Sequence, residues 1–558
     1  MQKFLKKLDD LAGIETENVW AKRFERVAFI FLVLMFLFAP HSIAATQTAW
    51  ITGMFFWLLS FAKLKINKIN AKAQRHKGAK KKINKKLCVF ASLRLCVKKL
   101  GLLDIALWAF FWWSVISSIF SYAPDLSINK LRGTAIFLIF YFVINNLKNL
   151  RAVKFLAVAL VFSCMVNVIW TPIQRIIGRG IEIHGVSATS PLAKALLIEG
   201  DALLTADGKK LAMPEDLIAQ IEQNETTKVK FYRPDFDFVV DVKRENLLAG
   251  ETALQKLGIE SWKKSHNWRS SGFYGHYTTY AEVLQLIASL VFGLFIASLF
   301  REKKKVKEKN FPFLPFSLSP FLLFCFAAMS LALLLTVTRA SQLALIVSIF
   351  AIVFIVNRKM LLILSVIILP IALGGLFFLQ QSRNVEFFDL QDDSTKYRQT
   401  MWRDGVRIWT ETPRKFIFGV GMDSTQRYWR EWQMFDGGKL PLGHFHSTPL
   451  QLLVERGLFA FLLWLWILWL FARTLLLRKE KFSDIEAQKI SSSPLLPFSP
   501  SWIERGIILG AFGGLVGFFT SGLVHYNLGD QEVAMVFFML MGLGVSISCQ
   551  NSLRERAV

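Results

Sequence analysis

The chain contains little cysteine. Five occur in 558 residues, and none lies in a segment that we expect to face outward, so we predict no structural disulfide even in an oxidising compartment. Cys88 and Cys96 are also too far apart for a Cys-x-x-Cys pair, which disfavours a zinc site there. The five are Cys88, Cys96, Cys164, Cys325 and Cys549.

Patterns of membrane proteases and of metal enzymes are missing as well. No His-Glu pair occurs, which excludes the His-Glu-x-x-His helix of a metalloprotease. The run Thr520-Ser-Gly-Leu-Val-His525 does not fit an intramembrane serine protease, which needs Gly-x-Ser and a histidine on a later span. The outward connections offer no clustered His, Cys and Asp set with ligand spacing, so we expect no metal and no cofactor.

Acidic residues are scarce, and the imbalance is local. The chain has 67 Lys and Arg against 41 Asp and Glu, a net charge of +26. Residues 63–100 hold fourteen Lys or Arg and no acid, which is over half of that net charge. In a membrane protein such a loop is typically a cytoplasmic retention signal, so we expect no nucleic-acid partner. We expect no catalytic role for this loop or for the low-complexity stretches 303–320 and 482–501.

Apolar residues, by contrast, are abundant. They make up 53% of the chain, and the mean hydropathy is +0.39. Several runs approach the ~20 residues that cross a bilayer as a helix. The sequence therefore predicts an all-α polytopic membrane protein, whose first run is long enough to stay as an anchor. We predict about twelve spans, near residues 27–44, 49–63, 101–121, 131–147, 152–171, 277–300, 313–337, 340–356, 360–380, 448–477, 506–525 and 532–549.

Basic residues in the connections set the orientation. Arg301–Lys307, Asn357–Lys359, Arg478–Lys481 and Arg554–Arg556 fall on one side, with the N-terminus and the 63–100 loop. Both termini are then expected in the cytoplasm. The domains follow: 1–171 with five spans and the basic loop 63–100; an outward loop 172–276; 277–380 with four spans; an outward loop 381–447; and 448–558 with three spans.

The first outward loop contains a small α/β module over about 178–244. Strand-like alternation appears at Gly180–Val186 and Lys228–Arg233, and Pro214–Ile221 has helical spacing. The module resembles a bacterial-envelope PDZ domain, which implies peptide binding by strand addition with a backbone nest near Gly178–Ile181. The alternative is a structural spacer. The matching residues are Ser190-Pro-Leu-Ala-Lys-Ala195, Leu197-Ile-Glu-Gly-Asp201, Ala206-Asp-Gly-Lys209 and Pro214-Glu-Asp-Leu217.

Four outward-facing elements carry polar side chains at the membrane edge. Arg339, between two apolar runs, is the strongest candidate for a functional residue, because a charged side chain inside a membrane costs free energy unless it is paired or faces water. A snorkelling helix-end residue is the alternative. The other elements hold Arg269, Tyr274 and His276; Arg403 and Arg407; and His444, His446 and Ser447 at the start of the run from Pro449.

Together these elements resemble the O-antigen ligase family. Its motif of His, then Asn, Ser or Gln, then nine residues and Gly appears here as His446-Ser447 and Gly457, with Ala460 at the last position. The family's Ser-Arg turn appears as Thr338-Arg339. Its Arg…Gly segment appears as Arg269 to Gly275, and its Pro-x-x-Gly-x-Gly stretch is loosened to Pro413…Gly419-Val-Gly421.

The resemblance implies transfer of a glycan from a polyprenyl-diphosphate carrier to an acceptor hydroxyl on the outer face of the bacterial cytoplasmic membrane, without a metal. Arg339 and Arg269, with Arg403 as a third, would neutralise the leaving diphosphate. His446 would be the general base, because imidazole titrates near neutral pH. The acceptor stays open: a glycolipid (ligase), a growing glycan (polymerase) or a protein (O-oligosaccharyltransferase). A polysaccharide or lipid transporter is the rival from another class, although no repeated half-sequence is visible.

Overall fold

A computed structural model describes residues 2–75, 101–233, 236–266, 268–300, 318–359, 393–439, 443–488 and 501–557, with six further positions between 361 and 374. The chain divides into two compact units. The first comprises Met1–Met165, Thr278–Ser330 and Thr338–Val558; the second comprises Val166–Tyr277 and Leu331–Val337. The predicted boundary near residue 171 therefore falls inside a helix that continues into the second unit.

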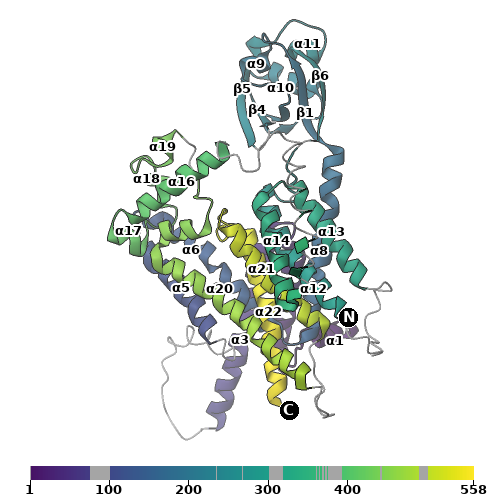
Figure 1. Ribbon diagram of the computed structural model, residues 1–558, viewed down its shortest axis with the longest axis vertical. Coiled ribbons are helices and arrows are strands. Elements are labelled where there is room, and N and C mark those ends of the chain that lie inside the picture. The colour runs from purple at the N-terminus through teal and green to yellow at the C-terminus, as the bar shows by residue number, and fades with distance from the viewer. Residues whose placement is uncertain are drawn as a thin grey trace. The chain divides into compact units, whose positions relative to one another are not determined.

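Helices make up the first unit (Figure 1). Long apolar helices follow one another along the chain. In chain order the helices are α1 (Gln2–Ala12), α2 (Val19–Phe38), α3 (Ile43–Arg75), α5 (Leu102–Ile119), α6 (Pro124–Thr134), a 3-10 turn (Ala135–Phe137), α7 (Leu138–Asn146), α8 (Leu150–Ile177), α12 (Tyr277–Leu299), α13 (Leu318–Leu335), α14 (Arg339–Val356), α16 (Asp393–Thr410), α17 (Pro413–Phe418), α18 (Ser424–Tyr428), α19 (Met434–Gly438), α20 (Thr448–Gln488), α21 (Trp502–Gly522) and α22 (Gln531–Ala557).

Eight helices within the described ranges are long and apolar enough to span a membrane, which supports the predicted polytopic class. They coincide with eight of the twelve predicted spans. Of the other four, 27–44 and 49–63 overlap α2 and α3, and 313–337 overlaps the shorter apolar helix Ser319–Leu335. The span predicted at 360–380 lies largely outside the described residues, as do most of the basic loop and of stretches 303–320 and 482–501. Twelve spans therefore stays a prediction.

Small residues let the central helices approach closely. A Cβ on Gly293 of α12 would lie 2.3 Å from the Gly510 nitrogen of α21, and a Cβ on Gly510 would lie 2.5 Å from the Leu290 Cα. Apolar burial drives helices together only weakly in lipid, so such backbone contacts are how membrane helices gain packing energy. The glycines of α21 thus fix α12 and α21 against each other.

The second unit holds a sheet with strand order β5-β4-β2-β1-β6. Its fifteen fully buried apolar residues form a core of their own, including Ile183, Leu217 and Phe231. The predicted strands and helix of the module are confirmed. The elements are β1 (Arg179–Val186), α9 (Pro191–Lys194), β2 (Ala202–Ala206), β3 (Lys209–Lys210), α10 (Pro214–Gln223), β4 (Thr226–Arg233), β5 (Phe236–Lys243), a 3-10 turn (Arg244–Asn246), α11 (Ala253–Leu257) and β6 (Ile259–Ser265).

The predicted end of the module at residue 244 is too early. Strand β6 pairs antiparallel with β1 over the whole of its length, from Arg179 opposite Ser265 to Val186 opposite Ile259. Because β2 pairs with the other edge of β1, that strand is interior. At Ile181, the end of the predicted nest Gly178–Ile181, β1 therefore has a strand on each side, which leaves no open edge there for a peptide to add.

Candidate functional site

The His446 element is held by the residue between its two histidines. Phe445 is 1% exposed and belongs to an apolar cluster with Met401 and Val454. Its amide donates to the Gln451 side chain of α20 (2.9 Å), and its carbonyl accepts from the Trp402 indole of α16 (2.8 Å). Burial of Phe445 therefore fixes the backbone that carries the histidines on either side.

The two histidines lie in a group of aromatic rings. The ring centroids of His444 and His446 are 4.9 Å apart. Tyr397 of α16 lies 6.2 Å from His446, and Tyr526, between α21 and α22, lies 6.1 Å from His444. Burial raises the pKa of both tyrosines, so both stay protonated at neutral pH. His446 is partly buried, and its φ is +45°, a backbone conformation that residues other than glycine rarely adopt.

A loop that sequence reasoning missed caps the same helix. The amide and hydroxyl of Thr448, at the start of α20, both donate to the carbonyl of His525 (3.0 and 3.1 Å). The His525 ring in turn lies 3.0 Å from the buried carboxylate of Glu282 on α12. The loop that carries Tyr526 is therefore tied to both α12 and α20. A carboxylate in an apolar span was the signal available in the sequence.

Gly457, the motif glycine, is where α20 breaks. Its dihedrals are φ +77° and ψ −178°, a region that is essentially restricted to glycine. The carbonyls just before it accept from outside the helix: Val454 from the Val420 amide (2.8 Å) and Arg456 from the Trp113 indole (2.9 Å). A Cβ on Gly457 would lie 1.9 Å from the Ile417 carbonyl oxygen.

The Pro413…Gly419-Val-Gly421 stretch is the partner of that break. Pro413 begins α17 and Gly419 follows its end, with φ +74° and ψ −172°. The Gly421 amide then donates to the Glu455 carbonyl (2.9 Å). A Cβ on Gly419 would meet the Arg456 nitrogen at 2.4 Å, and one on Gly421 would meet the Ser121 hydroxyl. Gly419 and Gly457 thus allow close backbone contact between the two segments, and Gly421 allows close contact with the side chain of Ser121, between α5 and α6.

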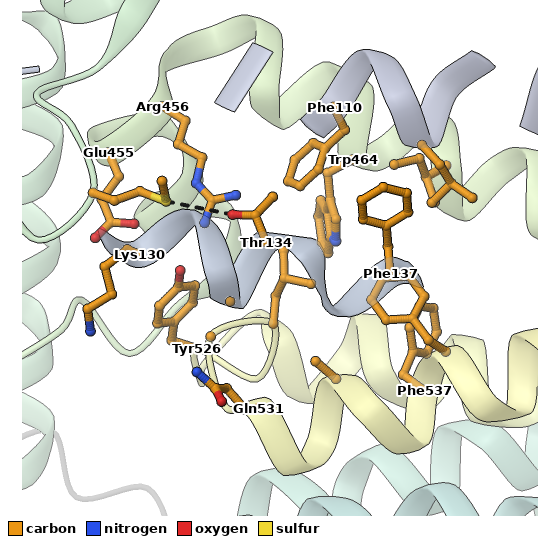
Figure 2. Close-up of a pocket in the computed structure, with 18 of the residues that line it drawn as sticks. Phe110, Lys130, Thr134, Phe137, Glu455, Arg456, Trp464, Tyr526, Gln531 and Phe537 are labelled. Carbon is orange, nitrogen blue, oxygen red and sulfur yellow. Dashed lines mark hydrogen bonds between the residues drawn. The ribbon is translucent and has the colours of Figure 1, made fainter. Parts of the chain in front are cut away.

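A pocket with a cavity volume of about 110 Å³ opens beside this break. Figure 2 shows its two kinds of lining, with charged and hydroxyl groups of Lys130, Glu455, Arg456 and Tyr526 at one end and aromatic rings at the other. Because Tyr526 also lies against His444, the polar end of the pocket adjoins the histidine element. The labelled apolar residues are Phe110, Phe137, Trp464 and Phe537.

The other predicted residues of the first unit differ in how deeply they are placed. Arg339 begins α14 and is half-buried. Arg403 and Arg407 flank the buried carboxylate of Asp404 on α16, at 3.9 and 3.8 Å, but their own side chains are 70% and 48% exposed. Arg407 also donates to the Trp432 carbonyl (2.8 Å). Ser447 is buried, and its hydroxyl accepts from the Leu450 amide.

Arg269, Tyr274 and His276 belong to the second unit. The Arg269 guanidinium lies 4.6 Å from the centre of the Tyr277 ring, and exposed His276 stacks on the same ring at 4.6 Å. Tyr274 is buried. The segment is held to α8, because Asn167 accepts from the Phe273 amide (3.0 Å).

Among the described residues no group of three or more His, Cys, Asp or Glu could hold a metal ion. One Asp-x-Asp spacing does occur in the first outward loop, at Asp235-Phe-Asp237. Asp237, on β5, pairs with Lys230 of β4 at 2.8 Å. That carboxylate therefore forms an ion pair between two strands of the sheet.

Apolar helices and a polar, aromatic-lined site between them define an integral membrane protein. Residues 324–465 match the family model described as O-Antigen ligase, about a quarter of the chain. The match contains Arg339, Arg403, His446 and Gly457 and leaves out Arg269. It supports an enzyme of the O-antigen ligase or polymerase type, acting in glycan transfer with lipid-linked substrates. A comparison with curated proteins found no match.

Proposed function

We propose that this protein transfers a glycan from a polyprenyl-diphosphate carrier to an acceptor hydroxyl at the outer face of a bacterial cytoplasmic membrane, with both termini in the cytoplasm. The observation that carries the proposal is the His446 element, fixed by Phe445 and set beside a pocket that has a polar and an apolar end. The family match over residues 324–465 supports the same chemistry.

His446 is proposed as the general base. It would take the proton of the acceptor hydroxyl while that oxygen attacks the anomeric carbon and the carrier diphosphate leaves. Direct displacement inverts the configuration at the sugar. The neutral hydroxyls of Tyr397 and Tyr526, whose rings adjoin the two histidines, can hydrogen-bond a sugar or phosphate oxygen without competing for the proton. Ser447 and His444 complete the proposed substrate contacts.

The leaving diphosphate needs cations, and no metal is invoked. Arg339 is proposed for this role because it is half-buried at the first residue of α14. The positive end of the helix dipole and the guanidinium charge lie together there, and both favour an anion. Arg269, with Tyr274 and His276, is proposed to join it, and Arg403 and Arg407 are weaker, more exposed candidates.

The sheet of the second unit is proposed to be a PDZ-like spacer. The order of strands and helices along the chain supports the likeness, and the pairing of β1 on both edges favours the spacer over a peptide-binding site. A peptide partner has no support from the sheet's pairing.

The test is deletion of the gene followed by gel analysis of surface polysaccharide. A ligase predicts loss of long chains from the lipid anchor and accumulation of lipid-linked polymer. Chains of a single repeat would indicate a polymerase, and an unchanged polysaccharide profile with altered glycoproteins would indicate a protein acceptor. Complementation by His446→Ala should fail. An unchanged profile for both glycans and glycoproteins would overturn the proposal.

A further inference from the structure

The pocket beside the break in α20 contains a buried cation without an acidic partner. Arg456 is 5% exposed. Its guanidinium lies 3.3 Å from the Ser114 hydroxyl and 5.4 Å from the centre of the Phe110 ring. No carboxylate in the described ranges lies within 4.0 Å of it, and its Nε has no hydrogen-bond partner there. An unpaired charge at that depth costs several kcal/mol unless something else compensates it.

The two nearby carboxylates have other contacts. Asp423 pairs with Lys130 at 2.7 Å at the more exposed rim of the pocket. Glu455 accepts from the Asp423 amide at 3.1 Å. Both acids at the polar end therefore have partners at bonding distance, whereas the Arg456 guanidinium has only neutral contacts at such distances and its Nε has no hydrogen-bond partner among the described residues. A ligand oxygen could therefore complete the surroundings of the Arg456 Nε.

The rest of the pocket is apolar. Aromatic and aliphatic side chains from four helices line it, including Phe137 from the turn before α7, Trp464 from α20 and Phe537 from α22 (Figure 2). Leu107, Ile467, Leu468, Ala534 and Phe538 extend the same surface. A hydrocarbon chain is the ligand that such a lining favours, because burying it gains about 25 cal/mol for each Å² removed from water.

We propose that this pocket binds a lipid phosphate, with a phosphate oxygen on the Arg456 guanidinium and the hydrocarbon chain along Phe137, Trp464 and Phe537. Guanidinium is suited to this because it stays charged and offers paired N–H donors to phosphate. The Tyr526 hydroxyl, at the same end, supplies a further donor. The site does not depend on transfer chemistry, since it would hold a lipid whether or not the chain is an enzyme.

Two lipids offer this chemistry, an isoprenoid phosphate and an ordinary phospholipid. The full-length protein in detergent would be titrated with photoreactive farnesyl phosphate, photoreactive phosphatidylglycerol and photoreactive farnesol, and crosslinked peptides would be mapped. We expect crosslinks in α20 around Trp464 and in α22 around Phe537, with the phosphate-bearing probes bound at least about tenfold more tightly than farnesol. Preference for farnesyl phosphate over phosphatidylglycerol would identify a carrier-type lipid, and equal binding would identify a bulk lipid.

Two variants test the two ends separately. Arg456→Met should bring farnesyl phosphate down to the affinity of farnesol and leave farnesol binding unchanged. Its matched control is Arg427→Met, which makes the same charge change outside the pocket, where Arg427 pairs with Asp125. Gly133→Leu should block all three probes, because Gly133 faces the pocket and an added Cβ comes no nearer than 3.7 Å to another atom. Ile128→Trp, an exposed site on the same helix, is its control.

The proposal is overturned if wild-type protein binds farnesol as tightly as farnesyl phosphate. It is equally overturned if Gly133→Leu, folded by its melting curve, crosslinks like wild type. Binding is measured without any transfer step, so these outcomes are independent of the test in living cells described above.

Discussion

At the scale of single residues, the site depends on side chains whose neighbours force an unusual conformation. His446 has a positive φ, and the residue before it is buried and hydrogen-bonded at both its amide and its carbonyl. Gly405 makes that burial possible, since a Cβ there would lie 2.9 Å from the Phe445 ring. The imidazole is therefore presented by a rigid backbone, as a catalytic base requires.

His446→Ala is expected to lower glycan transfer by about 10²–10⁴-fold, because the acceptor hydroxyl loses its proton acceptor. The measurement is transfer from a lipid-linked donor by protein in liposomes, with membrane expression checked in parallel. His444→Ala, which removes a proposed substrate contact but leaves the proposed base in place, should cost less, since His444 is exposed and lies outside the motif position. Full activity in the His446 variant would show that His446 is not the general base.

Arg339→Lys is expected to lower transfer by about ten- to a hundredfold while keeping the charge, because lysine cannot offer paired donors to a diphosphate. The loss should appear in the rate at saturating donor as well as in its apparent affinity. Arg403→Lys, at a 70% exposed side chain, should have a smaller effect in the same assay. An Arg339→Lys protein with wild-type kinetics would show that Arg339 is only a polar residue at the N-terminus of α14, without a role in diphosphate binding.

At the scale of elements, the motif glycines act through the backbone. The break in α20 exposes carbonyls, and the loop after α17 supplies amides to them at 2.8 and 2.9 Å. The Ser117 hydroxyl of α5 adds a bond to the Phe418 carbonyl (2.7 Å), so a third helix is tied to the same place. The same break carries Arg456 to the pocket. One local distortion thus organises the polar end of the site.

Gly457→Ala is expected to destabilise the membrane unit by about 1–3 kcal/mol from backbone strain alone, with a further cost from the contact to Ile417. Thermal unfolding of the detergent-solubilised protein measures this. Gly133→Ala, at a glycine with room for a Cβ, is the control and should melt like wild type. Equal melting temperatures for the two variants would contradict the role given to Gly457.

At the scale of the whole molecule, the chain combines a membrane unit with a sheet that has its own core. The ends of the sheet meet, because Arg179 on β1 lies opposite Ser265 on β6. An insertion with adjacent ends can be accommodated without disturbing the elements on either side.

Replacement of residues 179–265 by a short Gly-Ser linker is therefore expected to leave the membrane unit folded, with an unchanged melting transition. If the sheet is a spacer, transfer by the shortened protein should fall only modestly in liposomes. Loss of folding would show that the sheet stabilises the membrane unit, and complete loss of transfer with intact folding would show a direct role in substrate or partner binding.

Metal independence is a prediction that concerns the whole protein. Transfer is expected to be unaffected by a chelator at millimolar concentration, because cations of the chain itself are assigned to the diphosphate. The rate is measured before and after chelation, with added Mg²⁺ or Mn²⁺ as the comparison. If chelation abolished activity and one of these ions restored it, a metal ion rather than the arginines would neutralise the diphosphate.

The sequence by itself determined the membrane class, eight of the spans, the strands and helix of the inserted module and the motif around His446, because length, hydropathy and local spacing are written along the chain. It did not reveal β6, whose pairing with β1 joins residues far apart in sequence. Only the tertiary structure decided that Tyr526 lies beside His444, that Gly419 and Gly457 lie against the backbones of α20 and α17, and that Arg456 is a buried cation facing a pocket. Those are contacts between distant segments, and their energies depend on which backbones approach, which no local pattern encodes.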